Sequence, residues 1–123
     1  MSEQRPPGGE RGSGGMLVAS IVLVLVTAAG VGAWIAAWYG CLEHARSAAD
    51  LASVAGAQAR AKGADACEAA RYTASRNAAR VTLCAVAGDD RSFTVTVRVA
   101  VPLRPAVPHA PRQVEATSKA GSV

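Results

Sequence analysis

The chain has 123 residues, a formal net charge of +4 and an isoelectric point near 9.4. Its composition is 50% hydrophobic but only 4% aromatic, and outside residues 16–39 the apolar side chains are mostly alanine, which buries little area. This composition argues against a catalytic cleft. The basic residues are scattered singly without interleaved aromatics, which argues against a nucleic-acid-binding surface.

Residues 1–15 contain Pro6 and Pro7, several glycines and charges of both signs. Such a segment cannot bury enough apolar area to order itself, so we expect a flexible tail. Arg5 and Arg11 precede the apolar run that follows, whereas Arg46 alone lies close behind it. This charge bias favours a cytoplasmic N-terminus.

Residues 16–39, MLVASIVLVLVTAAGVGAWIAAWY, form an uncharged run that exceeds the roughly 20 residues needed to cross a bilayer core as a helix. Trp34, Trp38 and Tyr39 cluster at its C-terminal end, as expected at the headgroup level. We therefore predict a transmembrane helix. A buried helix of a soluble domain would need a larger core than the remaining residues supply. A secretory signal cut after Ala33 is the other alternative, although the run is longer than such signals usually are.

Residues 40–63 contain no proline and many alanines, so we expect the membrane helix to continue outward and to end at Gly63. Small residues recur there at alternating spacings of three and four, which predicts a stripe that packs against a partner helix. The stripe comprises Leu42, Ala45, Ala49, Ala52, Gly56 and Ala59, and the span repeats the pattern at Ala28, Gly32 and Ala36 and at Ala29, Ala33 and Ala37. General alanine bias is the alternative explanation.

Residues 64–101 predict a small module of a second helix and a β-hairpin. Asp65 and Glu68 have the spacing of a helix-capping box. Residues 81–86 are apolar and β-branched, and Gly88 and the two aspartates after it favour a turn. In residues 92–101 a phenylalanine and four valines alternate strictly with Ser92, Thr94, Thr96, Arg98 and Ala100. A lone hairpin is marginal in water, so the second helix is expected to cover it.

Four prolines follow the second strand, at Pro102, Pro105, Pro108 and Pro111, so residues 102–123 are expected to be extended or disordered. The predicted fold class is therefore α+β: a single N-terminal transmembrane helix that continues into an exposed helix, followed by a short helix and a β-hairpin.

Cys67 and Cys84 bracket the second helix, and a disulfide between them would stabilise this small module by roughly 3 kcal/mol. It would also place the module in an oxidising compartment. A zinc site is the alternative, but His44 and His109 complete no recognisable ligand spacing with these cysteines. Cys41 is interpreted as a small apolar residue or as the site of an interchain bridge.

Catalytic patterns are missing from the sequence, and we expect neither an enzyme nor a bound cofactor or metal. The two histidines lie far apart, and no nucleophile has a base near it in the sequence. Asp50 stands one helical turn after Arg46, which favours either a weak intrahelical ion pair or a polar contact that sets the register of a helix bundle.

The order of these parts resembles the TadE-like proteins of actinobacteria, relatives of the pseudopilins of Flp (Tad-type) pilus and secretion systems. The resemblance lies in the tail ending ERGSG (Glu10–Gly14), the single apolar helix, the segment HARSAADLASVAGA (His44–Ala57), and the cysteine pair followed by the strand SFTVTVRVAV. It covers most of the chain up to Val101.

The resemblance implies a leader cleaved after a glycine by a prepilin-type membrane peptidase, followed by helix packing into a pilus or pseudopilus. Gly12 and Gly15 are the candidate cleavage positions. The glutamate that usually follows the cut by five residues is replaced by Leu17 or Ser20. An uncleaved, single-pass subunit is therefore the alternative. In either case we expect the N-terminus in the cytoplasm, the module outside the cell membrane and other subunits of the machine as partners.

Overall fold

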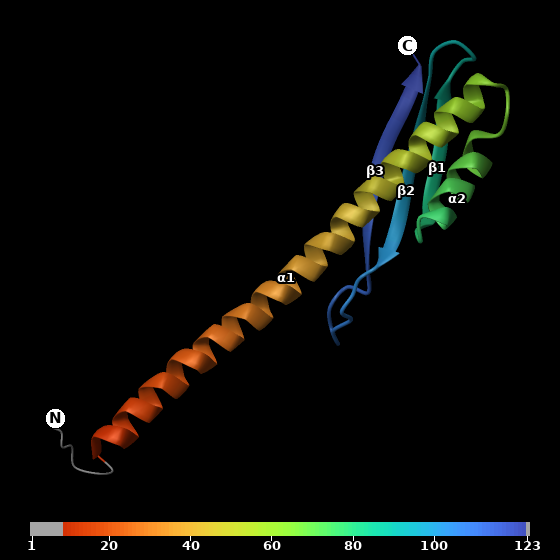
Figure 1. Cartoon of the computed structure of the whole chain (residues 1–123). Helices are drawn as coiled ribbons and strands as arrows, with labels where there is room; N and C mark the ends of the chain where they lie inside the picture. Colours follow the sequence, from red (N-terminus) through yellow and green to blue (C-terminus); the bar gives the residue numbers. More distant parts are fainter. Residues whose placement is uncertain (1–8, 123) are drawn as a thin grey trace. The chain divides into compact units, whose positions relative to one another are not determined.

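The computed structural model describes the backbone of residues 9–122 and the side chains of residues 12–122. In chain order the elements are α1 (Gly9–Ala61), α2 (Ala66–Arg76), β1 (Arg80–Gly88), β2 (Phe93–Pro102) and β3 (Gln113–Ser122) (Figure 1). Two compact units meet between Ala36 and Ala37, and we call the second one, Ala37–Val123, the head. The fold class is α+β, as predicted.

Helix α1 is continuous over 53 residues, which confirms that the apolar run extends into a longer helix. It begins at Gly9, so the expectation of a flexible tail is wrong for Gly9–Gly15, while residues 1–8 lie outside the described part of the chain. Once a helix exists, each added residue gains a hydrogen bond without a new nucleation step, which offsets the poor propensity of glycine.

The end of α1 is set by Gly63, which adopts a positive φ of 81°. The amide of Gly63 donates to the carbonyl of Arg60, and the amide of Ala64 donates to the carbonyl of Ala59. These two bonds are those of a Schellman motif. That motif requires a residue that can adopt the left-handed backbone conformation without strain, as glycine can. The predicted helix end is therefore confirmed to within two residues.

Helix α2 starts at the predicted cap, because the Asp65 carboxylate accepts hydrogen bonds from the amides of Cys67 and Glu68. Its apolar face is made of small residues, Ala66, Ala70 and Ala74, all of them buried. The short helix is followed by a sharp reversal in which Ala78 has a φ of 54°. The chain thereby returns along β1.

The sheet has three antiparallel strands in the order β1-β2-β3, one more than the predicted hairpin. The expectation that residues 102–123 are extended or disordered, without regular structure, is wrong, since β3 pairs with β2 from Gln113 opposite Pro102 to Ser122 opposite Phe93. Three of the four prolines lie in the connection between β2 and β3, and the fourth, Pro102, occupies the end of β2. The ten residues of β3 contain none.

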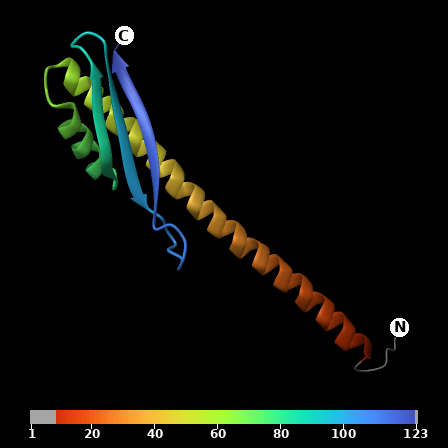
Figure 2. The ribbon, with the colours of Figure 1, turned by 180° about the vertical axis from the view of Figure 1, so that it is seen from behind.

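Both helices of the head cover the same face of the sheet. Figure 1 shows the part of α1 that belongs to the head in front of the strands, and in Figure 2, seen from behind, the strands lie in front of it. Val95, Val97 and Val99 on this face are fully buried, whereas Thr94 and Arg98 on the opposite face are exposed. The strict alternation of β2 therefore separates a core face from a solvated one.

Candidate membrane span and helix-packing site

The apolar part of α1 has its large side chains exposed. Met16 is 74% exposed, Leu23 67% and Ile35 52%, and no part of the most apolar stretch is buried inside the protein. A buried core helix would have these side chains covered, so that alternative from the sequence does not hold. Within the described residues, α1 is the one helix long and apolar enough to cross a membrane.

Small residues form an uncovered stripe on this apolar part. Ala28, Gly32 and Ala36 are all exposed, and a Cβ added at Gly32 would meet no atom within 4 Å. Gly12 and Gly15, the candidate cleavage positions, are also in open space. The stripe is therefore available for close approach by another helix, as small-residue faces in membranes are.

The continuation of the stripe in the head is covered by the chain itself. Ala49 and Ala52 have no exposed area, and a Cβ added at Gly56 would lie 3.1 Å from both Val95 Cγ1 and the Ala66 carbonyl oxygen. These residues were predicted to face a partner helix, and the prediction is wrong for Ala49, Ala52 and Gly56. Their close-packing partners are β2 and α2 of the same chain.

Asp50 makes a polar contact between α1 and β3. The hydroxyl of Ser118 donates to its carboxylate at 2.5 Å, and the hydroxyl of Ser53 donates to its backbone carbonyl at 2.9 Å. The two serine oxygens lie 3.3 Å apart, and Ser53 is buried. Asp50 therefore makes a polar contact across elements, as one interpretation of the sequence held, but the partner is a strand and not a second helix.

A disulfide joins Cys67 on α2 to Cys84 on β1, with 5.8 Å between their Cα atoms. This confirms the predicted pair and removes the zinc alternative at these two thiols. The bridge is compatible with α2 because that helix is only 11 residues long and the chain reverses at Ala78. It ties α2 to the edge of the sheet.

Cys41 is a free, partly buried thiol in the head. It lies against the segment that links β2 and β3: the Arg104 amide donates to its sulfur at 3.5 Å, and the thiol faces the Arg104 carbonyl at 3.6 Å. The indole of Trp38 donates to the Pro105 carbonyl at 3.3 Å. An interchain bridge at Cys41, one of its two interpretations from the sequence, stays untested.

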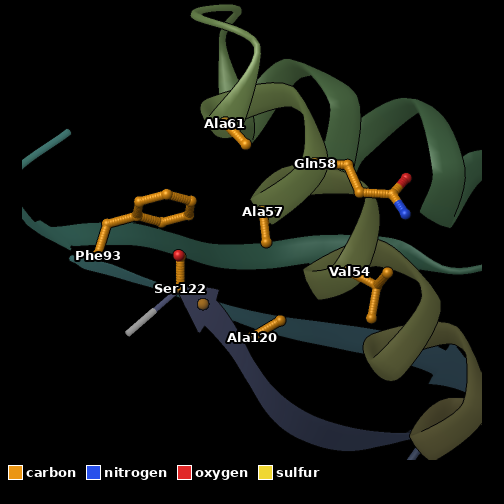
Figure 3. Close-up of a pocket in the computed structure, with 8 residues that line it drawn as sticks. Val54, Ala57, Gln58, Ala61, Phe93, Ala120 and Ser122 are labelled. Carbon is orange, nitrogen blue, oxygen red and sulfur yellow. The ribbon is translucent and has the colours of Figure 1, made fainter. Parts of the chain in front are cut away.

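Two grooves flank α1 in the head. The first has a volume of about 310 Å³ and lies between α1 and the ends of β2 and β3 (Figure 3). The ring of Phe93 lies across it from Ala57 and Ala61, and its wall includes no charged side chain. The second, of about 470 Å³, lies beside Cys41 and His44. The polar side chains in the lining of the first groove are Gln58 and Ser122.

One exposed turn of the head holds a carboxylate whose pKa is shifted by its hydrogen bonds. The amides of Ser92 and Arg91 donate to the Asp89 carboxylate and hold the pKa of that group below its ordinary value. Nearby, Arg60 and Asp90 form an ion pair at 3.2 Å. Among the described residues, no three histidine, cysteine, aspartate or glutamate side chains gather as metal ligands would.

Comparison with protein-family models, with curated proteins and with solved structures finds no match to this chain. Sequence reasoning located the apolar helix, the disulfide and the cap of α2. It missed the contacts of Ser118 and of the segment that links β2 and β3. The alternation of Val114, Ala116, Ser118 and Ala120 could have indicated the strand that carries Ser118.

Proposed function

We propose that this chain is a single-pass membrane protein that acts as a minor pilin-like subunit or assembly component of a Flp/Tad-type pilus or secretion machine. It works by packing its apolar helix against other helices in or at the membrane. In this role it has partners and no substrate.

The observation that carries the proposal is that the small residues of α1 are exposed in its apolar part and buried in its C-terminal part. Its apolar part leaves the small residues Ala28, Gly32 and Ala36 exposed, whereas its C-terminal part buries the small residues Ala49 and Ala52 under the chain's own sheet. A solitary anchor needs only to be apolar, and it has no need of an alanine and glycine stripe. A subunit that assembles needs an unoccupied packing face on one part of the helix and a rigid attachment of its head on the other.

The disulfide supports the orientation. Cys67–Cys84 belongs to a small head whose helix faces are mostly alanine, and such bridges persist in oxidising compartments. The head therefore lies on the outer side of the cell membrane, with the N-terminus in the cytoplasm. The distribution of Arg5, Arg11 and Arg46 around the span favours the same orientation.

The alternative is a secreted binding domain released by cleavage after Ala33. Such a cut falls before Ala37, where the head begins, so the released fragment would keep the head whole. A single-span regulator of another membrane complex is a further alternative, which co-purifying partners would identify.

The test is the mass of the native N-terminus together with extraction of the membranes at alkaline pH. An integral protein that starts at Met1, Ser2, Ser13 or Met16 supports the proposal, with Ser13 and Met16 marking cleavage after Gly12 and Gly15. A protein that starts at Trp34 and is released into the medium overturns it. Cross-linked complexes that contain other pilus or secretion subunits support the assembly role, and complexes with an unrelated membrane enzyme favour the regulator.

A further inference from the structure

The segment that links β2 and β3, residues Leu103–Arg112, is held against α1 at one end of the head. Trp38 donates to the Pro105 carbonyl, and Cys41 contacts the backbone of Arg104. The amide of Leu103 donates to the carbonyl of Arg112 at 2.9 Å and closes the segment into a loop. We call this end of the head the Trp38 end and the loop the Trp38-end loop. Figure 2 shows the loop beside α1.

The contacts place the loop at the depth of the membrane interface. Trp38 and Tyr39 close the apolar run and mark the headgroup level. Cys41 follows Trp38 by three residues, a rise of about 4.5 Å along a helix. Because the loop contacts both Trp38 and Cys41, it lies at the height of the headgroups once α1 is in a bilayer.

Charge is distributed unevenly between the two ends of the head. Exposed arginines gather at the Trp38 end, on the end of α2, the start of β1 and the two ends of the loop: Arg76, Arg80, Arg104 and Arg112. Contacts fix this placement, since His44 Nε2 donates to the Asn77 carbonyl and Arg80 donates to Gln113. The acidic residues near this end are Glu43 and Glu115. The opposite end carries Asp65, Asp89 and Asp90 with Arg60, Lys62 and Arg91.

The groove of about 470 Å³ opens at the same end. Its wall is largely apolar, with Ala37, Gly40, Val101 and Pro102, and it also includes His44 and Arg104. A cationic side chain beside an apolar wall matches the boundary of a phospholipid, where the phosphate meets the glycerol and acyl region.

We propose that the Trp38 end of the head binds anionic phospholipid headgroups of the leaflet from which α1 emerges. Arg104 and Arg112 contact the phosphates, and the groove accepts the glycerol region of one lipid. The inference rests on the proposed function only in requiring α1 to be in the membrane. Its consequence is that lipid charge holds the loop, and with it the junction of β2 and β3, against the bilayer surface.

A second copy of the chain is the other occupant to consider, and charge argues against it. Two Trp38 ends facing each other would bring the same arginines together, and like charges across an interface are destabilising. An anionic bilayer supplies the opposite charge. Each arginine near such a surface raises the equilibrium constant for binding to it by about fivefold.

The test uses the full chain in nanodiscs of phosphatidylcholine alone or of phosphatidylcholine with phosphatidylglycerol, and measures amide hydrogen exchange in the Trp38-end loop. We expect exchange to slow in the anionic discs by the order of tenfold at low salt and the difference to shrink as salt rises. The variant Arg104→Gln/Arg112→Gln should lose most of this difference. The control Lys62→Gln/Arg91→Gln removes the same charge at the opposite end and should keep it.

Equal exchange in the two kinds of disc, with the chain still integral to both, overturns the lipid inference and leaves the membrane span intact. Protection that follows the number of chains per disc and ignores lipid charge overturns it in favour of a second copy. A chain that fails to enter either disc contradicts the proposed function itself, so the two failures are distinguishable.

Discussion

The hydroxyl of Ser118 on β3 donates to the carboxylate of Asp50 on α1 at 2.5 Å. The two residues are 68 positions apart in the chain, and their contact fixes the last strand against the first helix. A hydrogen bond to an ionised acceptor is stronger than a neutral one. Its position makes this bond a measure of whether β3 is docked.

We predict that Ser118→Ala and Asp50→Asn each destabilise the head by about 1 kcal/mol, and that a double-mutant cycle gives a coupling of similar size. The measurement is pulse proteolysis in urea of the full chain in detergent micelles. Ser47→Ala on the same helix is the control, since Ser47 is exposed and makes no such bond. A coupling near zero would show that the bond does not hold β3 in place.

The disulfide predicts that the head loses much of its stability when the bridge is removed. Cys67→Ser with Cys84→Ser should leave membrane insertion intact but lower the free energy of unfolding of the head by about 3 kcal/mol, because the bridge closes a loop of 17 residues in sequence. Limited proteolysis of membrane-inserted chain reports this as rapid loss of the head. Cys41→Ser should behave like the parent, and resistance equal to the parent in the double variant would remove the stabilising role of the bridge.

The uncovered stripe predicts that Gly32→Leu inserts normally and loses cross-linking to its partners. Leucine keeps the helix apolar and raises its propensity, but its side chain would hold a neighbouring backbone away. Leu25→Ile on the same helix should cross-link like the parent. If both variants cross-link equally, the stripe is alanine bias and the packing half of the proposal is wrong.

Gly56 should respond to leucine in the opposite way. A Cβ there already approaches Val95 Cγ1 and the Ala66 carbonyl oxygen at 3.1 Å, so a leucine cannot fit without moving β2 or α2. We expect Gly56→Leu to destabilise the head by about 3 kcal/mol. Gly32→Leu should leave the urea midpoint of the head unchanged, and the two variants together separate packing within the chain from packing between chains.

Acidification predicts a local effect at the turn after β1. The amides of Ser92 and Arg91 favour the ionised form of Asp89, so its pKa is depressed below the ordinary 3.8. The stabilisation of the turn by the ionised Asp89 is therefore complete above pH 3.8 and is lost as the pH falls through the depressed pKa of this group. A carboxyl carbon NMR titration should give a midpoint below 3.8. A midpoint at or above it would contradict the hydrogen bonding of the turn.

The local features of this protein could be predicted from the sequence because each depends on neighbouring residues. An uncharged run over residues 16–39 fixes one long apolar helix, Gly63 ends that helix through its conformational freedom, and Asp65 begins the next. The alternation in β2 fixes its two faces in the same way.

The role of the alanine stripe was decided only by the tertiary structure. Ala28 and Ala49 occupy equivalent positions in the pattern, and nothing in their spacing tells that one is exposed and the other buried. The difference arises because residues far along the chain fold back over Ala49. A periodicity of small residues determines that the helix has a face suited to close packing, but it does not determine which element packs against that face.

The fate of the last residues was decided in the same way. The four prolines from Pro102 to Pro111 favour an irregular segment, and the strand after them consists mostly of small and polar residues with little β propensity. It forms because β2 offers an unpaired edge and Asp50 offers an acceptor to Ser118. Strand pairing depends on partners distant in sequence, so composition determined the connection and only the folded chain determined the strand.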